Sequence, residues 1–131
     1  NSVNKISGDD QLLKTEFLDQ VHSGKRIFKN IDLENIDLRN ENLSGLSFIG
    51  CFITADFRNS DLSNTKFIDG NVKYSDFRDA NLTNSLMENL GVEGTRFKGS
   101  VTKDFVFRGN SSYSVTGIGQ NEFNEWIYNI E

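Results

Sequence analysis

Residues 55–64 read ADFRNSDLSN, and residues 75–84 read SDFRDANLTN. Both stretches place a Leu or Phe at every fifth position, and the same spacing continues beyond them in both directions. A period of five matches neither the 3.6-residue repeat of an α-helix nor the two-residue alternation of a strand. The chain is therefore expected to be built from a short unit repeated many times.

The repeat extends from residue 26 to residue 109 as seventeen units, each centred on one residue that is usually Leu or Phe. The predicted centres advance by five, with one step of four between Phe48 and Phe52 that places a deletion near Gly50 and Cys51. A small residue usually stands two positions before the centre, and Asp or Asn often stands one position before it. The predicted centres are Phe28, Leu33, Leu38, Leu43, Phe48, Phe52, Phe57, Leu62, Phe67, Val72, Phe77, Leu82, Met87, Val92, Phe97, Thr102 and Phe107.

This unit resembles the small–Asp/Asn–Leu/Phe–x–x repeat of the pentapeptide repeat family, most clearly in residues 55–64 and 75–84. The resemblance covers about two thirds of the chain. It implies an all-β solenoid, a right-handed quadrilateral β-helix of about four coils with four units per coil. In such a coil the centre and the small residue point inward, and the other three residues of the unit point outward. We expect a short α-helix to cap each end, because open ends of a β-helix expose unpaired strands.

Sorting every fourth centre into a column supports four units per coil. Phe is concentrated in the first and third columns, and Leu fills most of the fourth. At a coil spacing of about 4.8 Å, stacked rings lie within the range of offset aromatic packing. The interior is then filled by side chains and too narrow for a ligand, so we expect the core to be purely structural.

The first 25 residues are predicted to carry the N-terminal cap, a helix over about 9–22. Leu13, Phe17 and Val21 recur at helical spacing along it. Asp9 and Asp10 suit its start, and Gly24, two residues after its end, suits its termination.

Residues 110–131 are predicted to form a mobile Gly- and Ser-rich loop over 110–120 and then an amphipathic helix with Asn121 as a possible cap. Two roles remain open for this helix: a lid on the last coil, or a homodimer seam like that in the topoisomerase-protecting branch of the family. The residues of this cap or seam are Phe123, Trp126, Ile127 and Ile130.

The third face of the solenoid is predicted to carry a charged ladder, since its outward residues repeat almost unchanged from coil to coil. A solvated, charge-paired surface and an anion-recognising strip for an acidic partner segment are both open for it. The basic members are Arg39, Arg58, Arg78 and Lys98, and the acidic members are Asp37, Asp56 and Asp76.

The first and second faces are predicted to expose apolar side chains around one corner of the middle coils. Such a patch marks a partner surface or a dimer surface when it is contiguous, whereas cover by a terminus or loop of the same chain is the alternative. The candidate residues are Ile49, Ile53, Ile68, Tyr74 and Leu86.

Catalysis has little support in the sequence. His22 is the only His, and Cys51, predicted to point outward, is the only Cys. No catalytic site, metal site or cofactor is therefore expected. The net charge of −5 makes nucleic-acid binding unfavourable, and no apolar run is long enough to span a membrane.

The leading hypothesis is a non-catalytic interaction and structural module that presents flat faces to a protein partner. A second is a DNA-mimicking modulator of a type II topoisomerase, disfavoured by the net charge of only −1 over residues 26–109. A third is a spacer or targeting domain of a larger, effector-like protein, which the absence of an initial Met favours somewhat. The compartment is left open, with the cytoplasm slightly favoured over secretion or a processed form.

Overall fold

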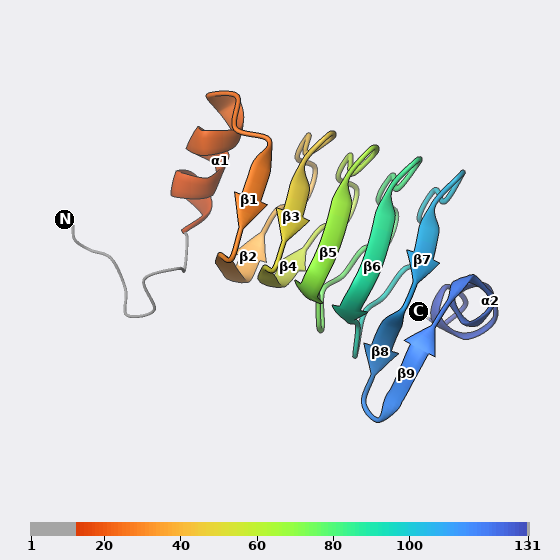
Figure 1. Cartoon of the computed structure of the whole chain (residues 1–131). Helices are drawn as coiled ribbons and strands as arrows, with labels where there is room; N and C mark the ends of the chain where they lie inside the picture. The colour runs from red at the N-terminus through yellow and green to blue at the C-terminus, as the bar shows by residue number, and fades with distance from the viewer. Residues whose placement is uncertain (1–12, 131) are drawn as a thin grey trace.

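The computed structural model describes residues 13–130. The chain forms a four-sided β-solenoid of about four coils with helical segments at both ends (Figure 1). The elements in chain order are α1 (Lys14–His22), β1 (Ile27–Lys29), β2 (Asp32–Asp37), β3 (Ser47–Ile49), β4 (Phe52–Asp56), β5 (Lys66–Asn71), β6 (Leu86–Gly91), β7 (Val106–Arg108), β8 (Asn110–Ser112), β9 (Val115–Ile118), α2 (Gln120–Glu122) and a π-helical turn, Phe123–Ile127.

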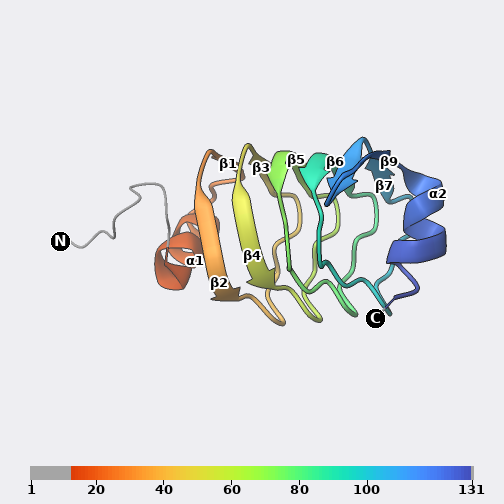
Figure 2. The ribbon, with the colours of Figure 1, turned by 90° about the horizontal axis from the view of Figure 1, so that it is seen from below.

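The strands of successive coils pair in parallel, and the chain rises by one strand at each turn of the solenoid. On the side that we call side 1, the order is β1, β3, β5, β6 and β7, with Phe28, Phe48, Phe67, Met87 and Phe107 facing inward. On side 2, β2 pairs with β4 (Figure 2). Sides 3 and 4 are held by isolated bridges and by coil-to-coil hydrogen bonds, such as the one from Phe57 N to Asp76 O at 2.8 Å.

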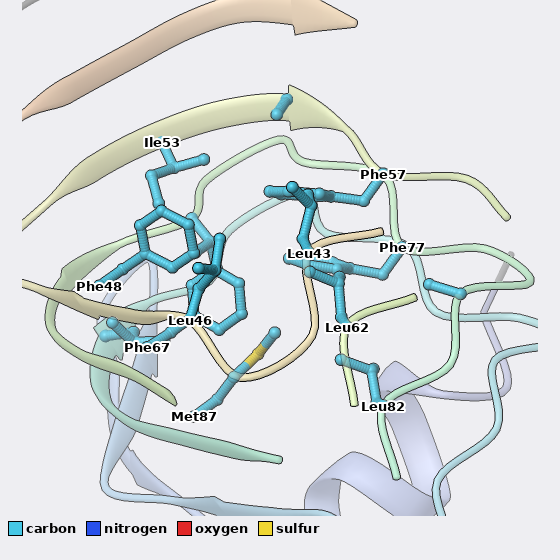
Figure 3. Close-up of a cluster of buried hydrophobic side chains, with 14 of the residues drawn as sticks. Leu43, Leu46, Phe48, Ile53, Phe57, Leu62, Phe67, Phe77, Leu82 and Met87 are labelled. Atoms are coloured by element: carbon cyan, nitrogen blue, oxygen red, sulfur yellow. The ribbon is translucent and has the colours of Figure 1, made fainter. Parts of the chain in front are cut away.

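The predicted aromatic columns are present in the core. On side 1 the Phe48 and Phe67 ring centroids lie 5.0 Å apart, with 16° between the planes. On side 3 the Phe77 ring stacks on Phe57 at 5.0 Å and on Phe97 at 4.9 Å. Figure 3 shows Phe57 above Phe77 and, beside them, the Leu column of side 4. Parallel offset stacking at the coil spacing explains why Phe recurs at every fourth unit.

Each corner of the solenoid turns through a residue in the left-handed backbone region. Sixteen residues, each two positions after a centre, have φ between +55° and +81°. Gly adopts this conformation without cost, and Asn and Asp tolerate it better than other residues. Fifteen of the sixteen corners follow this rule, and Tyr74 is the exception. The corners are Asn30, Asn35, Asn40, Gly45, Gly50, Asn59, Asn64, Asp69, Tyr74, Asp79, Asn84, Asn89, Gly94, Gly99, Asp104 and Gly109.

The predicted position of the deletion is wrong, because the shortened unit lies one unit later than predicted. Ile53, not Phe52, is the centre on side 2: Ile53 is 1% exposed and pairs with Leu33, whereas Phe52 is 53% exposed. Cys51, predicted to point outward, is buried two positions before this centre. The missing residue lies between Ile53 and Phe57, where β4 runs straight through and no left-handed corner forms. The neighbouring strand β2 compensates with a bulge between Glu34 and Ile36.

Side chains at the small position satisfy backbone groups inside the solenoid. The Ser75 hydroxyl accepts from Ala55 N at 3.0 Å and donates to Ile53 O at 3.1 Å in the preceding coil. Ser85 accepts from Thr65 N in the same way at 3.0 Å. A small hydroxyl here fills the inner corner and also satisfies a buried N–H, which explains the frequency of Ser at this position.

The N-terminal cap places the Phe17 ring over the side 1 stack, 5.0 Å from Phe28. Phe17 and Val21 are buried, while Leu13 is half exposed. The described helix α1 begins at Lys14, and the Glu16 carboxylate accepts from Leu13 N at 3.1 Å at its first turn. Residues 9–12 of the predicted helix lie outside the described residues.

The C-terminal end differs from prediction in two respects. Residues 110–118, predicted as part of a mobile loop, form the antiparallel hairpin β8–β9. The helix that follows is capped by Gly119, whose N–H donates to Glu122 at 2.8 Å, and not by Asn121. Its second part is π-helical, with Tyr128 N donating to Phe123 O five residues earlier at 2.7 Å, and Tyr128 rather than Trp126 lies with Phe123 on the inner surface.

Candidate protein-interaction surfaces

The outer surface of side 1 is a flat parallel sheet with two rows of outward side chains. Strand pairing places Ile49 beside Ile68 in one row and Leu86 beside Val106 in the other. Ile27 begins the second row at β1. Ile27 and Val106 are 53% and 38% exposed, and the other three are half-buried. We call these five residues the side 1 strip.

The charges beside the strip are unevenly paired. Lys29 flanks Ile49, and Lys66 flanks Leu86. Neither lysine forms an ion pair with any residue in the described part of the chain. The remaining charged pair in these rows, Arg108 and Glu88, is an ion pair at 3.4 Å. Side 1 therefore combines aliphatic groups with two available cations.

The predicted five-residue partner surface is only partly brought together. Ile49, Ile68 and Leu86 belong to the side 1 strip, but Ile53 faces the core because of the register of β4. Tyr74 lies at a corner after side 2, away from the strip. Ile27 and Val106 were missed, although both flank a predicted side 1 centre in the position that Leu86 occupies.

Side 3 carries the charged ladder. Within each coil the carboxylate accepts from the guanidinium two residues later, as in the 2.9 Å contact of Asp37 with Arg39 and the 2.7 Å contact of Asp56 with Arg58. The ladder also connects coils, because Arg39 Nε lies 3.7 Å from Asp56 and Arg58 Nε lies 3.6 Å from Asp76. A connected set of planar ion pairs holds the side chains in fixed orientations.

The ladder keeps its carboxylates ionised. The hydrogen bond from Arg39 holds the pKa of Asp37 well below its usual value, and the hydrogen bond from Arg58 lowers the pKa of Asp56. Burial raises the pKa of Asp76, but the hydrogen bonds from Arg78 outweigh this effect and the net shift is downward. Side 3 is therefore a paired surface at neutral pH, and its carboxylates are already occupied.

The regular pattern of the ladder ends in the fourth coil. Arg96 stands in the Asp row, paired in register with Asp76, and Lys98 stands in the Arg row. Both side chains are exposed, and neither has an ion-pair partner within residues 13–130. This end of side 3 is cationic, unlike the charge-balanced ladder of the first three coils.

The missing corner of the second coil leaves a hollow of about 300 Å³ on the surface. Asn35 and Tyr74, the corners of the first and third coils, stand on either side of it. The Tyr74 side chain is 61% exposed and lies against Gly94 of the next coil, where an added Cβ would come within 2.2 Å of the ring. An interaction with Tyr74 raises the pKa of Tyr113, the turn residue of the β8–β9 hairpin.

Of the four residues predicted to form the C-terminal cap or dimer seam, two pack against the last coil and two are exposed. Phe123 is buried with its ring centroid 4.9 Å from that of Phe107 and the planes tilted by 37°, and Ile127 packs against the core. The Tyr128 hydroxyl, not predicted to take part, donates to Ser100 O at 3.1 Å. Trp126 and Ile130 are 44% and 65% exposed and are the members left available to a partner.

Groups associated with catalysis are dispersed. Burial raises the pKa of the Cys51 thiol, and His22 is exposed at the end of α1. In the part of the chain that the structure describes, no three His, Cys, Asp or Glu side chains are grouped to hold a metal ion. None of the helices within residues 13–130 is long and apolar enough to cross a membrane.

The comparisons with known proteins agree with this architecture. The family model for pentapeptide repeats matches residues 52–89, with eight copies. No significant match was found among curated proteins.

Three solved structures are similar to this chain, and the likeness of fold rests on the first two. A trypsin-treated variant of QnrB1, a plasmid-mediated fluoroquinolone resistance protein, matches with a TM-score of 0.63 and 20% identity, over 65% of this chain and 45% of that one. A second trypsin-treated QnrB1 variant matches with a TM-score of 0.54 and 23% identity, over 56% and 39% of the two chains. A pentapeptide repeat protein from Nostoc PCC 7120 matches with a TM-score of 0.43 and 14% identity, over 84% of each chain.

The chain spans less than half of the length of the QnrB1 structures that it matches. The five-residue period, the left-handed corners, the inward Phe and Leu columns and the family match over 52–89 lead to one assignment. The chain folds as a pentapeptide repeat β-helix, and residues 52–89 match the model of the pentapeptide repeat family.

Proposed function

We propose that this chain is a non-catalytic module that binds a protein partner through one of its flat faces, and that side 1 is that face. The observation that carries the proposal is the side 1 strip, in which five aliphatic side chains follow one another across the five strands β1, β3, β5, β6 and β7. Contiguous apolar patches on a soluble protein surface mark interaction sites more often than scattered apolar residues do.

Sides 3 and 4 are less suited than side 1 to binding a partner. The side 3 ladder is largely satisfied by its own ion pairs, so a partner would have to displace Arg58 from Asp56 before using either group. On side 4 the outward hydroxyls are also engaged, as in the 2.6 Å hydrogen bond from Ser63 to Asp61. Side 1 offers apolar area whose burial needs no such exchange.

The proposal is tested by site-specific photo-crosslinking of the full chain in lysate of its source cells. We expect a crosslinker at Lys66 on side 1 to give a discrete adduct with one protein, and a crosslinker at Thr83 on side 4 to give none. The double change Ile49→Gln and Ile68→Gln should abolish the Lys66 adduct. Adducts of equal yield from both positions, or an adduct that survives the double change, would refute side 1 as the face.

The topoisomerase alternative rests on the resemblance to the pentapeptide repeat family, and the likeness to the QnrB1 structures concerns the fold alone. A mimic of duplex DNA needs a continuous acidic surface, because the DNA backbone is uniformly anionic. Side 3 instead alternates Asp and Arg and ends in the cations Arg96 and Lys98. A role as a spacer or targeting domain of a larger protein stays compatible with a binding face on side 1.

A homodimer through the C-terminal helix stays a separate prediction. With Phe123 buried in the lid, only Trp126 and Ile130 would form its seam. Light scattering on the chain and on Trp126→Asp tests it: a dimer that becomes a folded monomer supports the seam, and a parent that is already a monomer refutes it.

A further inference from the structure

We infer that the partner element recognised by side 1 is an amphipathic α-helix whose apolar stripe is flanked by carboxylates. The inference rests on the proposed function, since it names the chemistry of the partner at the same face. It follows from three properties of side 1: its backbone hydrogen bonding, the course of the side 1 strip and the placement of its unpaired cations.

The backbone of side 1 excludes recognition by strand addition. Every strand between β1 and β7 pairs with the strand before and after it, so the backbone groups are directed along the solenoid axis and not outward. A partner that adds a strand needs a free edge. A partner on the face itself can use only side chains, and a helix is the element that packs its apolar stripe onto the face of a sheet.

The course of the side 1 strip fits the length of a short helix. The strip starts at Ile27, crosses to Ile49 and Ile68 in the other row, and returns to Leu86 and Val106. Five strands at a spacing of about 4.8 Å give a length of about 19 Å, which a helix rising 1.5 Å per residue covers in about 13 residues. The coil spacing and the helical pitch of about 5.4 Å differ little over this length, so successive turns can contact successive coils.

The charges on side 1 favour acidic residues on both sides of the apolar stripe of that helix. Lys29 lies in the row of Ile49, and Lys66 lies in the row of Leu86, so the strip has an unpaired cation on each side. The carboxylates nearby are engaged: Glu88 pairs with Arg108, and Asp69 accepts from Asn89 at 2.8 Å. Glu or Asp residues on both flanks of the partner stripe would complement Lys29 and Lys66.

The same features of side 1 disfavour two alternative partners, a second copy of the chain and a nucleic acid. A second copy of the chain would place the two lysines against a face with the same two lysines. A nucleic acid would gain phosphate contacts from two cations only and would cover five aliphatic groups without benefit. Dimerisation through side 1 remains a measurable outcome of the experiment below.

The probe is a synthetic, fluorescein-labelled helical peptide of fifteen residues with Leu at positions 2, 6, 9 and 13 and Glu along both flanks. Two matched peptides carry Lys in place of Glu, or Gln in place of Leu. Binding to the full chain is measured by fluorescence anisotropy at low and high salt. We expect the Glu-flanked peptide to bind about tenfold more tightly than either matched peptide at low salt, with its charge-dependent part weakened at high salt.

Variants of the chain localise the contact. The double change Ile49→Gln and Ile68→Gln should weaken binding at least tenfold, since two buried aliphatic groups are lost, and Lys66→Glu should weaken it about threefold. The matched controls on side 4 are Val101→Gln and Lys103→Glu, both of exposed residues, and each should change the affinity by less than about twofold. Urea denaturation confirms that all variants remain folded.

The inference is overturned if the Lys-flanked peptide binds as tightly as the Glu-flanked one, if the side 4 controls weaken binding as much as the side 1 variants, or if no peptide binds. It is also overturned if the chain is a dimer that the double change dissociates, because the occupant is then a second copy. A Lys66 crosslink to a partner together with failure of the peptide refutes the helix and leaves the proposed function standing. Loss of both refutes the proposed function as well.

Discussion

Replacing Asn110 by Ala should destabilise the solenoid more than any single change of an exposed Asn. Asn110 is fully buried at the small position of the unit that follows β7. Its Oδ1 accepts from Leu90 N at 2.9 Å, and its Nδ2 donates to Met87 O at 3.1 Å. The Asn110 amide thus accepts from one backbone N–H and donates to one backbone carbonyl of the preceding coil, as the Ser75 hydroxyl does in the middle of the rod.

The expected magnitude follows from these two bonds. Ala leaves the buried Leu90 N–H without an acceptor, which costs about 1–3 kcal/mol, and removes a further hydrogen bond with a net contribution of about 1 kcal/mol. We therefore expect Asn110→Ala to lower the free energy of unfolding by about 2–4 kcal/mol. That is a large fraction of the roughly 5–15 kcal/mol that stabilises a typical domain.

Equilibrium urea unfolding, followed by circular dichroism, measures the effect. Asn121→Ala is the matched control, because Asn121 is exposed and should change stability by less than about 0.5 kcal/mol. Asn110→Ser should recover part of the loss, since a hydroxyl satisfies the equivalent N–H at Ser75 and Ser85. The reasoning fails if Asn110→Ala costs less than about 1 kcal/mol, or if Ser is no better than Ala.

Three further predictions concern the same coils. Ile53→Ala should cost about 2–4 kcal/mol and Phe52→Ala less than about 1 kcal/mol, and a larger loss at Phe52 would contradict the register of β4. Gly70→Ala should destabilise more than Gly45→Ala, because the Gly70 Cβ would lie 2.1 Å from a backbone carbonyl, whereas the Gly45 Cβ meets nothing within 4 Å and Ala there costs only about 1–2 kcal/mol for the left-handed corner; equal losses in urea would contradict this packing. The lowered pKa of Asp56 implies stability that is present above about pH 4 and lost as the pH falls further, so Asp56→Asn should flatten the decline of stability in acid; an unchanged decline would show that the ladder does not contribute to acid sensitivity.

The repeat could be read from the sequence because its two constraints are local and periodic. The stacking of coils requires a buried centre every five residues and similar side chains at every fourth centre. Both requirements restrict the residue types that occur at these positions. The charged ladder on side 3 could be predicted for the same reason, since Asp37 and Arg39 recur one coil later as Asp56 and Arg58.

The register around β4 was predicted wrongly because two adjacent apolar residues compete for one centre. Phe52 matches the residue type of the repeat better than Ile53, and the prediction weighed only residue type. The corners provide the missing signal. Each left-handed corner precedes the next centre by three residues, and Gly50 therefore selects Ile53. Counting from the corner also moves Cys51 into the core and the deletion to the segment after Ile53.

The C-terminal helix was predicted, but its inner residues were predicted only in part because its geometry departs from the standard periods. A helical pattern of three and four residues placed Trp126 on the inner surface, but the π-helical turn advances the contact by five residues to Tyr128. The hairpin β8–β9 was hidden by its Gly and Ser content, which is typical of loops. Its pairing depends on the stack below it, and this tertiary support is not encoded in the segment alone.

Tyr74 shows how the solenoid uses a strained corner for a structural purpose. A bulky residue in the left-handed region costs about 1–2 kcal/mol relative to Gly, and every other corner of the rod avoids that cost. The ring recovers contact area against Gly94, where any side chain would collide with it, and it interacts with Tyr113 at the turn of the hairpin. Tyr113 is itself in the left-handed region. The Tyr74 corner thus borders Gly94 of the next coil and the hollow left by the missing corner of the second coil. The strain at Tyr74 lies at a corner after side 2, and the strands of side 1 keep a regular parallel register.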